Sequence, residues 1–156
     1  KYEKNIQLIL AGAGPCEEEY KKMAKEKLTN DVIFGFFGKP ELLNLIRSSD
    51  LYVHSSEIEI EAIACIEAFA CGIVPVIANS KKSATKQFAL DDRSLFKVND
   101  SDDLAKKIDY WYEHEEERKK MSDAYAKHAD KYKLDRSIDL IMEMFNDAIK
   151  AKRNNK

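Results

Sequence analysis

Short β-rich runs alternate with longer stretches of helical periodicity along most of this chain. The runs that predict strands are Ile6–Ala11, Val32–Gly35, Leu51–His54, Ile73–Ala78 and Ser94–Val98. The stretches that predict helices are Cys16–Leu28, Pro40–Ser48, Glu61–Cys71, Ser83–Leu90, Asp102–Trp111, Glu115–Tyr132 and Asp135–Lys152. Strands that alternate with helices are typical of βα units and a parallel sheet. The sequence therefore predicts an α/β fold with a doubly wound parallel sheet up to about residue 100 and helices over residues 101–152.

The apolar pattern of these elements indicates how they are covered. The runs IQLILAG and GIVPVIAN are apolar on both faces, which predicts strands covered by helices on both sides. In the last predicted helix an apolar stripe contains Ile138, Ile141, Met142, Phe145 and Ile149. A stripe of this kind predicts that the helix packs against something along its length.

Size and charge exclude several classes of protein. A chain of 156 residues suits a single domain, spanning residues 1–156, with a real core. A formal net charge of −2 argues against nucleic acid as the main partner, because phosphate backbones need a concentrated basic surface. No run approaches the roughly 18 apolar residues of a membrane span. The three cysteines fit no metal-site spacing, so we expect a reducing cytoplasm and no metal.

In a doubly wound sheet, ligands bind beyond the carboxyl ends of the strands. The first such junction, LILAGAGPCEEEY, contains a turn with Gly12 and Gly14. The second, VIFGFFGKPEL, places Phe36 in a loop where it could receive a flat base. Each of these signals is weak on its own, and a purely structural role remains open for both.

The third junction, LYVHSSEIEIEAIACIEAFACG, holds the most unusual pattern. Glu67 is the only acid between Ala62 and Cys71, and a buried carboxylate needs a partner. Glu59 lies eight residues before it, which on an α-helix is about 12 Å of rise and about 80° of rotation. Both acids could then bind hydroxyl groups of one elongated ligand such as a nucleoside diphosphate sugar. The alternative is that Glu67 pairs with a lysine from a neighbouring helix.

Other polar residues carry weaker signals. His54 ends a predicted strand, where a packed or capping histidine is more common than a catalytic one. Lys81 and Lys82 follow the strand Ile73–Ala78 and could supply charge to a ligand, although a solvated turn is the simpler interpretation. No Ser-His-Asp order or metal-ligand spacing is present.

Taken together, these junctions resemble the C-terminal, nucleotide-sugar-binding domain of the group 1 retaining glycosyltransferases, which have two Rossmann-like domains (the B-type fold). The similarity runs from LILAGAGP through FGFFGKPELLNLIRSSDLYVHSS and EIEAIACIEAFACGIVPVIA to SLFKVNDSDDLAKKI. Its most specific element is the E-x7-E motif from Glu59 to Glu67.

The resemblance implies a role for each matching residue. Glu59 would contact the donor sugar near its anomeric centre as the catalytic residue, and Glu67 would accept hydrogen bonds from the ribose. Further donor-binding positions would be Gly12, Gly14, Phe36, Ser56 and the backbone amides of Ile60, Glu61 and Ala62. The resemblance implies no metal and no cofactor.

Two departures from the family pattern stand out. The family usually has a glycine after the first glutamate, whereas this chain has Ile60. The family domain also begins with a strand that carries a Gly-Arg pair, and that strand is absent before Lys1. Because this strand is central in the sheet, we expect a gap between its neighbours, which is either closed in another way or filled from outside the chain. The start at Lys1 also predicts a piece of a longer two-domain enzyme.

The expected function is therefore transfer of a sugar from a nucleoside diphosphate sugar to an acceptor hydroxyl, in polysaccharide or glycolipid synthesis. We expect the acceptor to be held by an N-terminal domain outside this chain, so that the isolated chain is inactive. The expected location is the cytoplasm, with peripheral association at the inner face of the membrane left open. The competing hypothesis is a non-catalytic α/β module that binds a nucleotide or a partner. A sugar-nucleotide epimerase is a third alternative, which the E-x7-E spacing disfavours.

Overall fold

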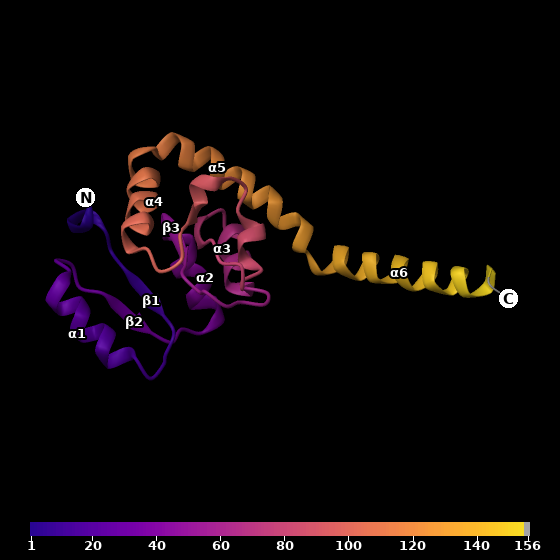
Figure 1. Ribbon diagram of the computed structural model, residues 1–156, viewed down its shortest axis with the longest axis horizontal. Coiled ribbons are helices and arrows are strands. Elements are labelled where there is room, and N and C mark those ends of the chain that lie inside the picture. The colour runs from indigo at the N-terminus through magenta and orange to yellow at the C-terminus, as the bar shows by residue number, and fades with distance from the viewer. Residues whose placement is uncertain (155–156) are drawn as a thin grey trace.

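The computed structural model describes residues 1–154, so residues 155–156 of the predicted domain lie outside the described part. The strands are β1 (Ile9–Ala11), β2 (Ile33–Gly35), β3 (Leu51–His54), β4 (Val74–Ala78) and β5 (Leu95–Phe96). The helices are α1 (Glu17–Lys27), α2 (Lys39–Arg47), α3 (Ile63–Ala70), α4 (Ser101–Glu113), α5 (Glu115–Ala129) and α6 (Leu134–Asn154), and short 3-10 turns include η2 (Thr85–Phe88) and η4 (Asp130–Tyr132). This βα alternation, followed by helices, confirms the predicted Rossmann-like α/β class (Figure 1).

All strand pairs are parallel, and they form two separate pieces of sheet. In the first piece β1 pairs with β2, and in the second the order is β3-β4-β5. Within the described residues, β1 and β3 each pair with only one neighbour. The sheet is thus broken between the β1–β2 piece and the β3–β5 piece, which is consistent with the gap expected from the sequence.

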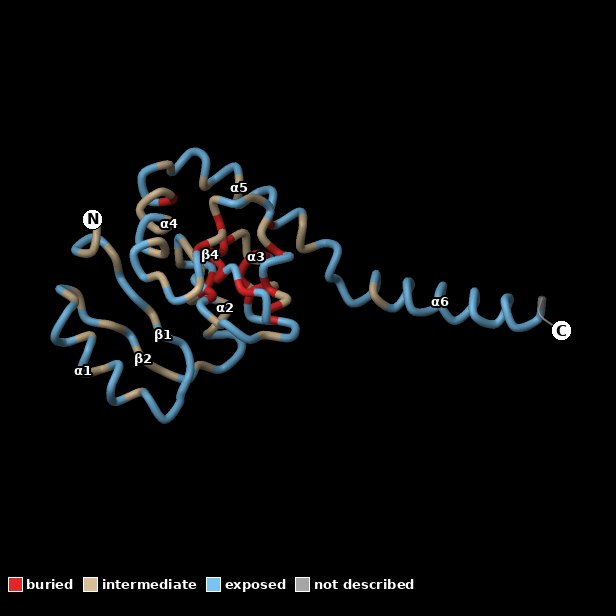
Figure 2. The backbone as a smooth tube through the Cα atoms, viewed as in Figure 1, coloured by how far each residue is buried: buried red, intermediate tan, exposed pale blue. Residues whose placement is uncertain are grey.

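The buried residues gather around β4. All five residues of β4 are buried, as the run GIVPVIAN predicts, because α3, α4 and α5 pack around this strand. Trp111 from α4, Tyr125 from α5 and Phe69 from α3 are fully buried in the same cluster. Figure 2 shows this core as the red segments around α3 and β4.

The β1–β2 piece, in contrast, contains no buried residue. The prediction that both faces of β1 are covered is wrong, since Leu10 is 37% exposed. The reason lies in α1, which has the sequence EEEYKKMAKEK and also buries no residue. A helix this polar offers little apolar surface to the strands.

Two predicted helices also differ from the structure. The stretch Ser83–Leu90 forms only the short 3-10 turn η2, because the Ser83 hydroxyl accepts a hydrogen bond from the backbone N–H of Thr85 at 3.2 Å. Such local side-chain bonds compete with helix formation. The last helix, α6, forms as predicted, but its apolar stripe does not pack along its length. It meets the fold at η4 and projects away from it (Figure 1).

Candidate functional site

The loops after β1 and β2 meet at the carboxyl ends of these strands. The Gly12 N–H donates to the Gly35 carbonyl oxygen at 2.7 Å, and Gly12 has a φ of 153°, which favours glycine. A Cβ built at Gly12 or Gly14 would meet no atom within 4 Å, so the space in front of this turn is open. Phe36 follows β2 and is 85% exposed, which leaves its ring free to stack on a ligand.

Glu59 does not lie on the helix that carries Glu67. Helix α3 begins at Ile63, after Ala62 adopts the left-handed conformation with φ 49° and ψ 53°. Glu59 instead forms an isolated parallel bridge with Ser83, in which its carbonyl oxygen accepts from the Ala84 N–H at 3.0 Å. The helical rise and rotation predicted between Glu59 and Glu67 are therefore wrong, because residues 59–62 form an irregular turn before the helix.

The carboxylate of Glu59 folds back onto this turn. Its Oε1 accepts from the Ile60 N–H at 2.9 Å. The backbone amide of Ala62, followed by those of Ile60 and Glu61, holds the pKa of Glu59 below its usual value, with a smaller effect from His54. Of the amides that the family resemblance assigns to the donor, that of Ile60 is thus bonded to the protein's own acid. An anionic ligand at this turn would have to replace the Glu59 carboxylate.

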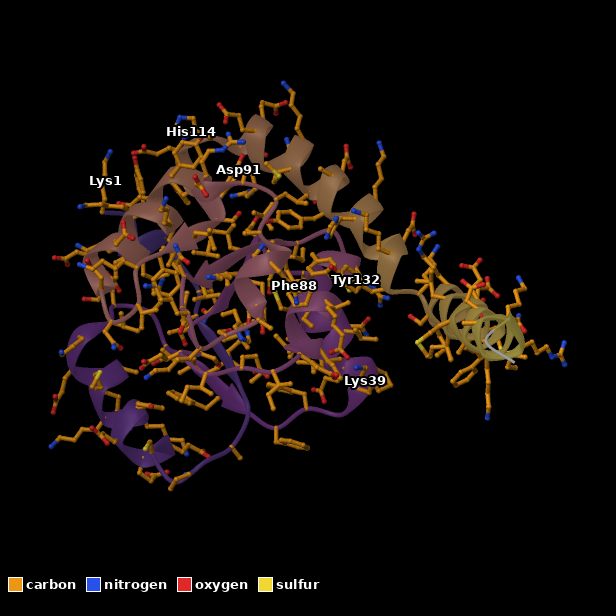
Figure 3. The ribbon with its side chains drawn as sticks, turned by 45° about the vertical axis from the view of Figure 1, so that its right-hand side comes forward. Lys1, Lys39, Phe88, Asp91, His114 and Tyr132 are labelled. Atoms are coloured by element: carbon orange, nitrogen blue, oxygen red, sulfur yellow. The ribbon has the colours of Figure 1, made fainter. Side chains whose placement is uncertain are left out.

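Glu67 lies on α3 with 20% of its side chain exposed, and it has a partner. The Lys39 ammonium, at the start of α2, forms an ion pair with Glu67 Oε1. Figure 3 shows Lys39 at the edge of the molecule. The alternative that a lysine from a neighbouring helix pairs with Glu67 is therefore confirmed. Since Lys39 is itself 59% exposed, solvent and ligands can reach the pair.

These contacts bring the predicted site residues together in two groups. Gly12 is bonded to Gly35, next to Phe36, and Phe36 is three residues before Lys39, which reaches Glu67. Ser56, half-buried, Glu59 and the amides of residues 60–62 form the second group after β3. Gly14 accepts from the Glu17 N–H at 3.1 Å and makes the entry to α1.

Comparison with known proteins assigns this arrangement to a family. The family of glycosyl transferases group 1 matches residues 1–128. The chain belongs to the group 1 glycosyltransferases. Among solved structures, the catalytic domain of cholesterol-alpha-glucosyltransferase from Helicobacter pylori is similar with a TM-score of 0.81 and 50% sequence identity, over 85% of this chain and 83% of that one. No curated protein sequence matches the chain.

In this glycosyltransferase domain, two polar residues at the site lacked a sufficient signal in the sequence. His54, at the end of β3, is buried, and its Nε2 lies 3.9 Å from Glu59 Oε2. Lys39 is 28 residues from Glu67 in the chain, so only the packing of α2 against α3 reveals their contact. Of the two lysines after β4, Lys82 donates to Glu57 Oε1 at 3.1 Å.

Three large apolar residues close to Glu59 in the sequence are exposed. Ile58 is 70% exposed and Ile60 is 84% exposed, and Ile63 in the first turn of α3 is exposed as well. Exposed apolar residues mark an interaction surface only where their side chains form a contiguous patch. The residue that replaces the expected glycine, Ile60, belongs to this group.

The described residues contain neither a candidate metal site nor a candidate membrane span. Among residues 1–154 no group of three or more His, Cys, Asp or Glu side chains is arranged to hold a metal ion. Across the same residues, none of the helices combines the length and apolar character that crossing a bilayer requires.

A cavity of about 390 Å³ lies beside α1, lined by residues that include Leu28, Asn30 and Val32. It adjoins the amino end of β2, at the opposite end of the strand from Phe36.

Proposed function

We propose that this chain is the donor-binding domain of an enzyme that transfers a glucosyl residue from a nucleoside diphosphate sugar to a hydroxyl group of a membrane lipid, including sterols. The observation that carries the proposal is its 50% identity to a cholesterol-alpha-glucosyltransferase catalytic domain, in a chain whose Glu59 and Glu67 follow the same strand. In this proposal Glu59 contacts the donor sugar, and Glu67 accepts hydrogen bonds from the ribose.

The surroundings of these two acids support the assignment. The exposed ring of Phe36 is close in sequence to Lys39, the partner of Glu67, and would stack on the base. The Ile60 amide already binds one anion, the Glu59 carboxylate, and the nearby Ala62 amide lowers the pKa of that acid. Both amides would receive the diphosphate in its place. Exposed Ile58 and Ile60 suit an apolar acceptor beside the reacting centre.

We further propose that a second domain outside this chain holds the acceptor and that α6 packs against it. The exposed apolar stripe of α6, which projects from the fold, supports this arrangement (Figure 1). The full-length enzyme would work in the cytoplasm at the membrane face, where a lipid acceptor is available. In this account the isolated chain transfers no sugar, and detectable transfer by the purified chain would contradict it.

The test is a transfer assay with the full-length protein, labelled uridine or guanosine diphosphate glucose, and vesicles that contain cholesterol. Replacing Glu59 by Gln should lower the transfer rate by roughly 10²–10³-fold, which is typical for losing one electrostatic group at a reacting centre. Glu57→Gln is the matched control, since Glu57 lies in the same loop and pairs with Lys82. Equal rates for the two variants would contradict the role of Glu59.

One observation favours the second candidate, a non-catalytic binding module. Glu59 and Glu67 are each engaged by groups of the protein itself, the turn amides and Lys39. If these contacts are permanent, neither acid is available to a donor. A full-length protein that neither binds the donor through these acids nor transfers sugar to any lipid or sugar acceptor would favour this module.

A further inference from the structure

His54 is a buried histidine whose ring nitrogen Nε2 has no hydrogen-bond partner among residues 1–154. It is the last residue of β3, and only 8% of it is exposed. Within the described residues, its Nε2 makes no hydrogen bond. Buried polar atoms are nearly always hydrogen-bonded, because an unpaired one has lost its hydration without gaining a partner. Because His54 lies at the carboxyl end of β3 beside Glu59, a functional role can explain why its Nε2 is left unpaired.

Tyr52 and Glu59 together indicate where the proton of His54 lies. The Tyr52 hydroxyl is 3.2 Å from His54 Nδ1, and burial raises the pKa of Tyr52, so it stays a hydroxyl. Burial also lowers the pKa of His54, which keeps the ring neutral with a single proton. When the hydroxyl donates to Nδ1, the proton is on Nε2. The opposite tautomer would direct a nitrogen lone pair at the Glu59 carboxylate.

The Nε2–H therefore faces an acceptor that is slightly out of reach. Glu59 Oε2 lies 3.9 Å away, beyond hydrogen-bond distance, while Oε1 is held by the Ile60 N–H. The carboxylate thus has two competing sets of donors, the turn amides and the imidazole. If a ligand anion takes the amides, a shift of about 1 Å brings Oε2 onto Nε2.

We infer that His54 is a positioning residue, whose Nε2–H binds and orients the Glu59 carboxylate when Glu59 leaves the turn amides, while Nδ1 is bonded to the Tyr52 hydroxyl. This role rests on the proposed function, in which the donor displaces Glu59 from the amides. In this role the neutral imidazole of His54 holds the Glu59 carboxylate toward the donor sugar. A misplacement of about 1 Å at a reacting group can cost roughly a hundredfold in rate.

The first test needs only this chain and no donor. Long-range nitrogen–proton NMR on wild type, with His54→Gln to assign the signals, should show His54 protonated at Nε2. Glu59→Ala should shift the Nε2 resonance, and Tyr52→Phe should mix the two tautomers. A proton on Nδ1, or no response to Glu59→Ala, would overturn the inference even if the protein proves to be a glucosyltransferase.

The second test uses the full-length protein and uridine or guanosine diphosphate glucose. His54→Leu should lower kcat by roughly ten- to a hundredfold with little change in the KM for donor, and His54→Gln, which restores an N–H donor, should recover most of the loss. His114→Gln, on a helix end far from Glu59 in the sequence, is the control and should behave like wild type. Equal losses in the Gln and Leu variants would show that the ring only fills space. If wild type itself neither binds donor nor transfers sugar, the proposed function fails, while the NMR result still decides the contact of His54 with Glu59.

Discussion

The β3–β5 half and the β1–β2 half of this domain are built from similar sequence patterns but bury very different amounts of surface. Strand β4 (VPVIA), in the β3–β5 half, is buried along its whole length. Strand β1 (ILA), in the β1–β2 half, is partly or fully exposed. Figure 2 shows the contrast, with buried segments in the β3–β5 half alone. The difference shows that an apolar run predicts what a strand is able to bury. What it does bury depends on the neighbouring strands and helices.

The covering helices explain the contrast. In the β3–β5 half, α3 and α5 supply Phe69 and Tyr125, whose rings lie 5.9 Å apart over β4. In the β1–β2 half, α1 supplies only Tyr20 and Met23, and both are exposed. We therefore expect the β1–β2 half to open at lower free energy than the rest of the domain.

The largest expected effect comes from truncating one apolar residue in each half. Phe69→Ala removes a fully buried ring and should lower the free energy of unfolding by about 3–5 kcal/mol. The matched change Leu10→Ala, at a side chain already in contact with water, should cost less than about 1 kcal/mol. Urea unfolding followed by the fluorescence of Trp111, which lies in the β3–β5 half, measures both. Equal losses of unfolding free energy in the two variants would mean that the two halves share one core.

A second prediction concerns the turn that joins the site to the core. Ala62 has a φ of 49°, which strains any residue with a side chain, so Ala62→Gly should stabilise the domain by about 0.5–1 kcal/mol. Ala68→Gly, in the middle of α3, should instead destabilise it by about 1 kcal/mol or more. Thermal unfolding of both variants checks this pair. Destabilisation by both would show that the backbone at residue 62 is not strained.

The smallest expected effect is a pH dependence that separates the halves. The Arg93 side chain lowers the pKa of Asp91 in the β3–β5 half, and the Thr29 backbone N–H lowers that of Glu3 in the other half. A lowered pKa adds stability above the ordinary value, near 4, and this stability is lost as the pH falls through the native pKa. At low pH, protonation of Asp91 should therefore lower the urea midpoint that Trp111 fluorescence reports. Protonation of Glu3 should only speed amide exchange in β2.

The matched variants for this prediction are Asp91→Asn and Glu3→Gln. Asp91→Asn should flatten the pH dependence of the midpoint below about pH 4, because the charged partner of Arg93 is gone. Glu3→Gln should leave the midpoint unchanged. If the urea midpoint depended equally on both acids, the two halves would unfold as one cooperative unit, which would contradict this prediction.

Much of the fold could be predicted from periodicity alone. The strand Leu51–His54 has the predicted bounds, and α5 and α6 begin within a residue of theirs, because long amphipathic stretches and short apolar runs are local signals. The break between β1 and β3 could be expected from the family pattern. The exposure of β1 could not, because it depends on how polar α1 is and on which strands lie beside it.

The candidate site was harder to predict. The acids Glu59 and Glu67 are visible as a motif, but the left-handed Ala62 that separates them is not, since alanine rarely adopts this conformation. The partners of these acids, Lys39 and the turn amides, depend on contacts between α2, α3 and the loop after β3. His54 looked like an ordinary packed residue until its burial and its distance to Glu59 were known.

The most direct measurement is calorimetry of uridine and guanosine diphosphate glucose binding to the full-length protein and to Glu67→Gln. Loss of a charged acceptor for the ribose should weaken binding by about 1.5–3 kcal/mol. Lys39→Gln is the control, because it removes the same ion pair but keeps the carboxylate, and it should change the affinity much less. A selective loss in Glu67→Gln would support the donor site at the carboxyl end of β3. Unchanged affinity in that variant, or no binding by wild type, would make Glu67 a structural acid and contradict the account.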